Sequence, residues 1–124
     1  MGFKFNSMFY KLKKEVIMFN EITITKMSKI KDKELSNLLI GRKGGITTIK
    51  ITDQILQQHH NANQLSRILH LDYKTITYHL NLMIDHEYVE KEKITQNYIY
   101  YPSKKLYNCI EEYSLIRNFL KIEY

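Results

Sequence analysis

The stretch HLDYKTITYHLNLM, residues 70–83, decides the fold. Its apolar residues recur at the spacing of one helix face, at Leu71, Ile76, Leu80 and Met83. Asp72 is a good N-cap, and its carboxylate suits the positive end of a helix. Leu71 and Ile76 then occupy the two positions of a hydrophobic staple. The stretch predicts a helix that starts after Asp72 and runs to about residue 86.

A second capped helix is predicted immediately before this one, over NANQLSRIL, residues 61–69. Asn61 can accept a hydrogen bond from a first-turn amide, and Gln64 can reach back to Asn61, which is a variant of the capping box. We expect its inward side to consist of Leu65, Ile68 and Leu69. About three residues separate the two helices, too few for an antiparallel return. They must therefore cross steeply, as in a helix-turn-helix.

The flanking segments supply the rest of the fold. We expect helices over residues 28–40, with Ser28 as cap and Gly41 as stop, and over about 46–58, with an apolar side of Ile46, Ile49, Ile55 and Leu56. After residue 87 the chain becomes rich in Tyr, Val, Ile and Thr, which predicts a hairpin with strands at about 88–93 and 97–101. A last helix is predicted over residues 103–121, with Ser103 as its cap.

This order of elements is that of a winged helix-turn-helix, a mainly α fold with a small β-hairpin and flanking helices. We place an N-terminal arm at residues 1–27, the winged-helix domain at 28–102 and a C-terminal helix at 103–124. The arm has roughly helical apolar spacing, but it could equally be a frayed leader or the result of a start codon placed too early.

The outer side of the helix over residues 72–86 is unusual for a solvated helix. It carries hydroxyls, aromatic rings, an amide and one lysine, where Glu/Lys pairs are more common. Such groups bond to base edges and phosphates, and in a winged helix this helix lies in the DNA major groove while the hairpin reaches the neighbouring backbone. We therefore predict DNA contacts at Tyr73, Lys74, Thr75, Thr77, Tyr78 and Asn81, with Arg42, Lys43, Lys91 and Lys93 in support. The alternative is a polar, Tyr-rich surface without a special role.

The bulk composition is compatible with this prediction. The net charge of +6 suggests a polyanionic partner, although a nucleotide-composition bias would also enrich Lys, Ile, Asn and Tyr. The chain lacks an apolar run of about 18 residues, so we expect no transmembrane helix and no membrane partner. One cysteine excludes an intrachain disulfide and fits a cytoplasmic location.

Residues 41–93 resemble winged helix-turn-helix transcriptional regulators of the broad ArsR type, most nearly a set common in archaea. The matching residues are Arg42, Gly44 and Gly45, then Asn61, Ala62 and Leu65, and then Leu71, Asp72, Tyr73, Lys74, Thr75, His79 and Leu80. The resemblance implies sequence-specific binding of double-stranded DNA, usually by a homodimer, and transcriptional control. The chain lacks the Cys-x-Cys element of the arsenic- and cadmium-sensing members, and Tyr78 stands where relatives often place a basic residue or His.

The C-terminal helix is the expected dimerisation element. Its apolar stripe is wider than one small domain needs, so we predict a homodimer contact through Leu106, Ile110, Tyr113, Ile116 and Leu120. Alternatively, the stripe packs back on its own chain or on residues 1–20.

Other functions have less support. The sequence has no Gly-rich phosphate loop and no nucleophile elbow, so we expect no enzyme. His59 and His60 are adjacent, and His79 and His86 are two turns apart, so neither pair can share a metal ion and no cofactor is expected. The main competing hypothesis is a winged-helix module that binds protein or RNA.

Overall fold

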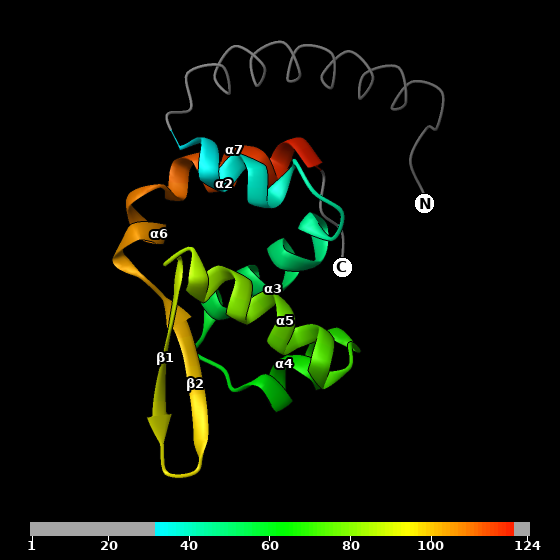
Figure 1. Cartoon of the computed structure of the whole chain (residues 1–124), viewed down its shortest axis with the longest axis vertical. Helices are drawn as coiled ribbons and strands as arrows, with labels where there is room; N and C mark the ends of the chain where they lie inside the picture. Colours follow the sequence, from blue (N-terminus) through cyan, green and yellow to red (C-terminus); the bar gives the residue numbers. More distant parts are fainter. Residues whose placement is uncertain (1–31, 121–124) are drawn as a thin grey trace, which may run out of the picture. The chain divides into compact units, whose positions relative to one another are not determined.

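The computed structural model describes residues 32–120. The chain divides into two compact units, Met1–Lys31 and Asp32–Tyr124, and only the second contains described residues. Its elements are α2 (Lys33–Leu39), α3 (Gly45–Gln57), α4 (Ala62–Leu69), α5 (Tyr73–Asp85), β1 (Val89–Ile94), β2 (Asn97–Pro102), α6 (Lys104–Asn108) and α7 (Ile110–Leu120) (Figure 1). The predicted arm and the predicted cap Ser28 lie outside the described residues, and within them Asp32 caps α2.

The helix-turn-helix forms with the predicted caps. The Asn61 side chain accepts from the Gln64 amide and the Gln64 side chain accepts from the Asn61 amide, both at 2.8 Å. Asp72 Oδ1 accepts from the Thr75 amide at 2.7 Å. Between the helices, His70 adopts a left-handed conformation with φ 55°, which ends α4 within one residue. The crossing of α4 and α5 is thus fixed by local hydrogen bonds on both sides of a three-residue turn.

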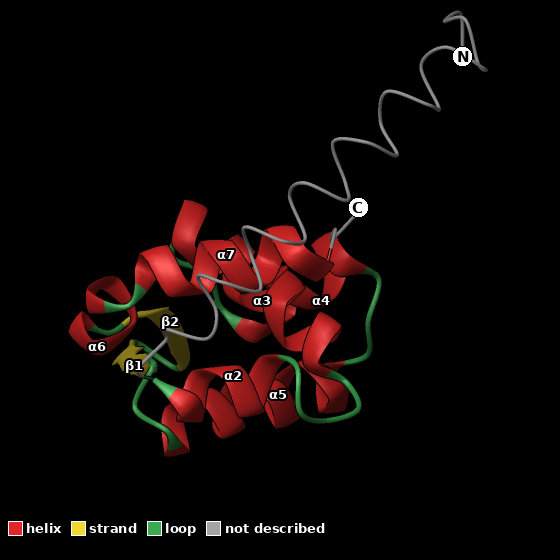
Figure 2. Cartoon of the chain, turned by 90° about the horizontal axis from the view of Figure 1, so that it is seen from above, coloured by secondary structure: helices red, strands yellow, loops and turns green. Residues whose placement is uncertain are grey.

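Helix α3 is the centre of the packing. It contacts α2, α4, α5 and β2, and in Figure 2 it lies between α7 and α5. The fully buried side chains come from every helix and from the start of the hairpin, and they include Leu35, Ile49, Leu65, Ile76, Leu80, Met83, Tyr88, Leu106 and Ile116. Helix α5 therefore rests on one shared core with its N-terminal end left free.

The hairpin has the predicted turn between its strands. Strands β1 and β2 pair antiparallel, with Lys91 opposite Tyr100 and Lys93 opposite Tyr98. The Tyr100 amide also donates to the His60 carbonyl at 2.8 Å, so the segment before α4 adds an isolated bridge to β2. This bridge fastens the wing to the helix-turn-helix.

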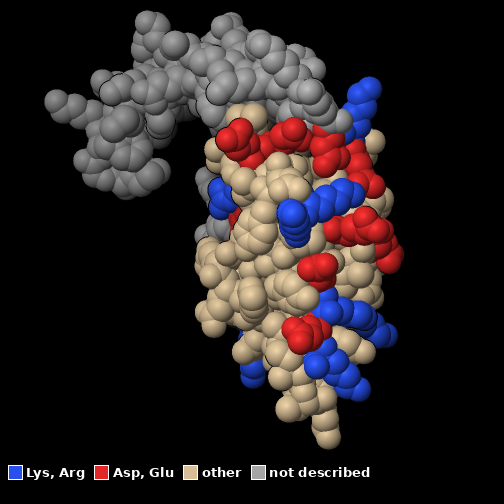
Figure 3. All heavy atoms as spheres, turned by 90° about the vertical axis from the view of Figure 1, so that its left-hand side faces the viewer, with Lys and Arg blue, Asp and Glu red and all other residues tan. Residues whose placement is uncertain are grey.

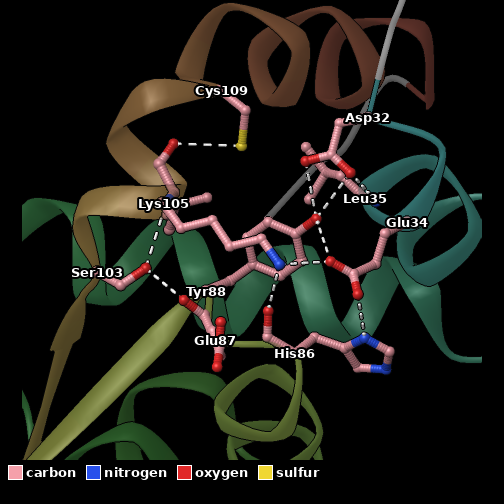
Figure 4. A network of polar contacts seen from close by, with 10 residues as sticks. Asp32, Glu34, Leu35, His86, Glu87, Tyr88, Ser103, Lys105 and Cys109 are labelled. Carbon is pink, nitrogen blue, oxygen red and sulfur yellow. Dashed lines mark hydrogen bonds and ion pairs between the residues drawn. The ribbon is translucent and has the colours of Figure 1, made fainter.

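A polar cluster fixes the C-terminal end of α5 (Figure 4). The buried Tyr88 hydroxyl lies 2.9 Å from both carboxylate oxygens of Asp32 and 3.1 Å from Glu34. Lys105 Nζ donates to Glu34 at 2.5 Å and to the His86 carbonyl at 2.8 Å, and the His86 ring contacts Glu34 at 3.0 Å. Hydrogen bonds from His86 and Lys105 lower the pKa of Glu34 to about 2. The start of α2, the end of α5 and α6 are joined here.

The predicted single helix over residues 103–121 is wrong. Ser103 caps a short α6, Cys109 has non-helical angles (φ −114°, ψ 25°), and α7 begins at the next residue. Because the chain turns at Cys109, the apolar sides of both helices pack on the core of their own chain. Three members of the predicted dimer contact, Leu106, Tyr113 and Ile116, are buried within the chain. Ile110 and Leu120 are half-buried.

Two isoleucines predicted to face inward are instead exposed. Ile46 on α3 is 49% exposed and Ile68 on α4 is 44% exposed. On α3, the buried side includes Thr48 and Thr52 in place of Ile46. The turn before α3 is tight: Gly44 has φ 89°, and a Cβ on Gly45 would come within 2.1 Å of the Leu39 carbonyl. The start of α3 therefore lies close against the end of α2.

Candidate nucleic-acid interface

Helix α5 separates into a buried side and an exposed side as predicted. Ile76, Leu80 and Met83 are at most 1% exposed. Tyr73 and Tyr78 are 53% and 60% exposed, and Lys74 and Asn81 are also exposed. The helix therefore presents two aromatic rings, an amide and an ammonium to solvent over its first three turns.

The two predicted threonines are less available than the other residues of the set. Both are half-buried. The Thr77 hydroxyl lies 3.0 Å from the Tyr73 carbonyl and 3.1 Å from the Lys74 carbonyl, so its proton stays within α5. The Thr75 amide is bound by Asp72, and hydrogen bonds from Thr75 lower the pKa of Asp72. This carboxylate is therefore ionised at neutral pH and stands beside Lys74.

The hairpin places its lysines on the side that also carries the buried Tyr100. Residues opposite one another in an antiparallel pair project to the same side, so Lys91 and Lys93 share the side of Tyr98 and Tyr100. Lys91 Nζ lies 4.6 Å from the centroid of the Tyr98 ring, a cation–π contact that holds the side chain along the strand. Glu90 and Glu92 project to the opposite side.

A small cleft joins the hairpin tip to the helix-turn-helix. It has a volume of about 80 Å³ and is lined by amides and tyrosines from three elements, namely Asn61, Asn63, Tyr73, Gln96, Asn97, Tyr98 and Tyr100, together with Ala62. The starts of α4 and α5 and the tip of the wing therefore surround one continuous polar surface.

Arg42, predicted to support the DNA contacts, is half-buried and hydrogen-bonded within the chain. Its guanidinium donates to the Lys43 carbonyl at 3.0 Å and to the Thr48 hydroxyl at 2.5 Å, and it lies 3.4 Å from His79 Nδ1. Lys43 is exposed. Thr48 Oγ1 also lies 2.8 Å from His79 Nδ1. The sequence did not predict this contact, and its only signal there is the joint presence of the Arg-x-x-Gly-Gly segment and His79.

Charge on the described unit is nearly balanced. Residues 32–120 carry eleven Lys or Arg and ten Asp or Glu. Figure 3 shows basic and acidic side chains interspersed along the hairpin side, with an uncharged tip and no continuous basic surface. Within residues 32–120, no three His, Cys, Asp or Glu side chains gather as a metal-binding group, and none of the helices is long and apolar enough to cross a membrane.

Comparisons with known proteins support the architecture. No family model and no curated protein matches the chain. Among solved structures, the chain is similar to a MarR mutant from E. coli complexed with operator DNA, with 16% identity, a TM-score of 0.53 and coverage of 97% of this chain and 86% of that one. It is also similar to the transcriptional regulator SlyA, with 13% identity, a TM-score of 0.50 and coverage of 90% and 78%.

These likenesses confirm the predicted winged-helix fold, since both neighbours are winged-helix regulators. At identities of 16% and 13% they extend no further than the fold. The finer resemblance to the ArsR type is not supported by them, because both neighbours are of the MarR kind.

Proposed function

We propose that this chain is a transcriptional regulator that binds double-stranded DNA sequence-specifically, with α5 in the major groove and the β1–β2 hairpin as the wing. The observation that carries the proposal is the division of α5, whose apolar side is fully buried while Tyr73, Lys74 and Tyr78 project from its free N-terminal half. The operator complex of the MarR neighbour supports it, because a similar fold binds DNA there. On this proposal the chain is not an enzyme.

Each exposed group has a role that its chemistry allows. Lys74 and Asn81 can bond to base edges, and the Tyr78 ring can pack on bases or sugars. Lys43, Lys91 and Lys93 are suited to phosphate, since a lysine contact to the backbone positions a protein without reading sequence. The carboxylate of Asp72 caps α5 and would repel a phosphate placed close to the start of the helix.

A homodimer is part of the proposal. Two copies of α5 about 34 Å apart would meet successive major grooves of a pseudo-palindromic site. Of the residues first predicted for the contact, Ile110 and Leu120 are the two that the chain itself leaves partly uncovered. Light scattering of the full chain at micromolar concentration tests this, and a monomer mass in the presence and absence of duplex would contradict it.

The test of DNA binding uses a labelled duplex from the gene's own upstream region, a scrambled duplex of equal length and an RNA of the same sequence. Fluorescence anisotropy at several salt concentrations should show the upstream duplex bound more tightly than both, with affinity that falls as salt rises. A folded protein that binds neither duplex at low salt refutes the proposal. Preference for the RNA favours the RNA-binding alternative.

Lys74→Ala should weaken binding by about 1–3 kcal/mol if Lys74 reads a base, and the loss should fall on the upstream duplex rather than the scrambled one. If Lys74 contacts only phosphate, both duplexes should lose affinity alike. Lys33→Ala is the matched control, because Lys33 is an exposed lysine on α2 whose neighbours Asp32 and Glu34 meet the C-terminal end of α5, opposite to the end that carries Lys74. Equal affinities of Lys74→Ala and Lys33→Ala would remove α5 from the interface.

A further inference from the structure

A chain of three polar side chains connects the turn before α3 to α5. The Arg42 guanidinium donates to Thr48 Oγ1 at 2.5 Å, and Thr48 Oγ1 lies 2.8 Å from His79 Nδ1. Thr48 is fully buried and His79 is 6% exposed. His79 belongs to α5 and directly follows Tyr78, whose ring it meets edge-on at 5.1 Å. The Thr48–His79 contact therefore anchors α5 at the residue next to Tyr78, whose ring is exposed.

The distances define the protonation state of the ring. Thr48 has one hydroxyl proton, and His79 Nδ1 at 2.8 Å is nearer than the Gly44 carbonyl at 3.3 Å. The Arg42 guanidinium lies 3.4 Å from Nδ1 and has only protons to present to it, so Nδ1 is bare and can also accept from Thr48. The imidazole is then neutral, with its proton on Nε2.

Protonation of His79 would disturb this arrangement. The new proton on Nδ1 would point toward the Arg42 donors, and a second cation would stand 3.4 Å from the guanidinium. The described groups around the ring are Thr48 from α3, Arg42 and Gly44 from the turn, and Tyr78 from α5 itself, and none of them is a carboxylate. Relief of the repulsion requires either Arg42 or α5 to move.

We propose that Arg42, Thr48 and His79 are positioning residues that hold α5 in its DNA-binding orientation only while His79 is neutral, so that DNA affinity falls on acidification. This inference rests on the proposed function. Burial and the neighbouring Arg42 charge lower the pKa of His79 from its usual value, so the loss falls on the acidic side of that value.

The sign of the effect separates it from ordinary histidine chemistry. Protonation of an exposed histidine adds a cation, which strengthens binding to DNA. Protonation of His79 should weaken binding. A loss of affinity on acidification therefore points to a buried imidazole, and the His79→Asn variant separates His79 from the other buried imidazole of residues 32–120, His60.

The first experiment compares the full chain with His79→Asn between pH 8 and 5.5 on the same upstream duplex. The asparagine oxygen can take the place of Nδ1 as an acceptor from Thr48 but cannot gain a proton. The ratio of the wild-type Kd to the variant Kd should be constant above pH 7.5 and should rise by up to about tenfold per pH unit below the pKa of His79. Circular dichroism at each pH verifies that both proteins remain folded.

Parallel pH profiles of wild type and His79→Asn overturn the inference while leaving the proposed function intact. Failure of the wild type to bind any duplex at pH 8 instead refutes the proposed function, so the two failures are distinguishable.

A second experiment does not depend on the folding of His79→Asn. Thr48→Val removes the hydroxyl at nearly constant volume, and Thr48→Ser keeps it. Thr48→Val should lose DNA affinity that Thr48→Ser largely retains, and its pH profile should lose the acidic drop. Equal affinities and profiles for the two variants contradict the role of Thr48.

Arg42→Gln separates positioning from direct contact. A positioning role predicts weaker binding with an unchanged slope of log K against log salt. A phosphate contact predicts a slope smaller by about one, and that result would overturn the assignment of Arg42.

Discussion

Tyr113→Phe is the sharpest test of how α7 docks on the winged helix. The Tyr113 hydroxyl is buried, 2.5 Å from Asp53 Oδ1 and 3.1 Å from the Ile49 carbonyl, and Asp53 Oδ2 accepts from Arg117 Nε at 2.7 Å. A hydrogen bond to a charged group contributes about 1.5–3 kcal/mol. Because Asp53 keeps its Arg117 contact, we expect the lower part of this range, about 2 kcal/mol, which for a domain of this size lowers Tm by roughly 10 °C.

Thermal and urea unfolding of the full chain measure this loss. Tyr107→Phe is the matched control, because Tyr107 on α6 is 53% exposed and should lose less than about 0.5 kcal/mol on the same change. In the double variant Asp53→Asn/Tyr113→Phe, the losses in the free energy of unfolding should not add, and the coupling energy should be about 0.5–3 kcal/mol. A Tyr113→Phe protein as stable as Tyr107→Phe would show that this contact does not hold α7 on α3.

Other changes test the remaining supports of the fold. Asn61→Ala removes the side-chain acceptor of the Gln64 amide, while the backbone amide of residue 61 can still donate to Gln64. The change should cost about 1 kcal/mol in urea unfolding, and a negligible loss would contradict the role of the cap. Leu80→Ala should cost about 2–5 kcal/mol, because Leu80 is fully buried, and calorimetry should show a lower Tm. The pKa of Glu34 is lowered from 4.5 to about 2 on folding, so its contribution to stability is complete above pH 4.5 and is lost as the pH falls toward 2. Glu34→Gln should therefore flatten the acid unfolding curve between these values, and an unchanged curve would argue against the cluster around Tyr88.

The features that the sequence predicted well are those decided within a few residues. The caps Asn61, Asp72 and Ser103 bond to amides three residues later, and the hairpin turn joins adjacent strands. Such contacts need no knowledge of the rest of the fold. Since the caps Asn61 and Asp72 also fix the spacing of α4 and α5, the helix-turn-helix could be predicted from local contacts alone.

The features that were missed depend on partners far along the chain. Thr48 meets His79 across 31 residues, and Asp53 meets Tyr113 across 60. A polar residue can be buried only where a specific partner satisfies its hydrogen bonds. The sequence does not identify such a partner for Thr48 or Asp53, so both look like solvated helix positions. Ile46 is predicted to face inward from apolar spacing alone, whereas the buried side of α3 includes the polar Thr48 and Thr52.

The distribution of charge bears on how specificity could arise. Residues 1–31 hold seven lysines and two glutamates, whereas residues 32–120 carry only one more base than acids. Non-specific affinity for DNA comes almost entirely from neutralised phosphates, so the described unit should hold unrelated duplexes weakly. On the proposed function, its discrimination would come from contacts to bases by the side chains of α5, chiefly Lys74, Tyr78 and Asn81. Such contacts would require α5 to keep a fixed rotation, so the buried side of that helix, with His79 at its edge, would matter as much as the side proposed to face DNA.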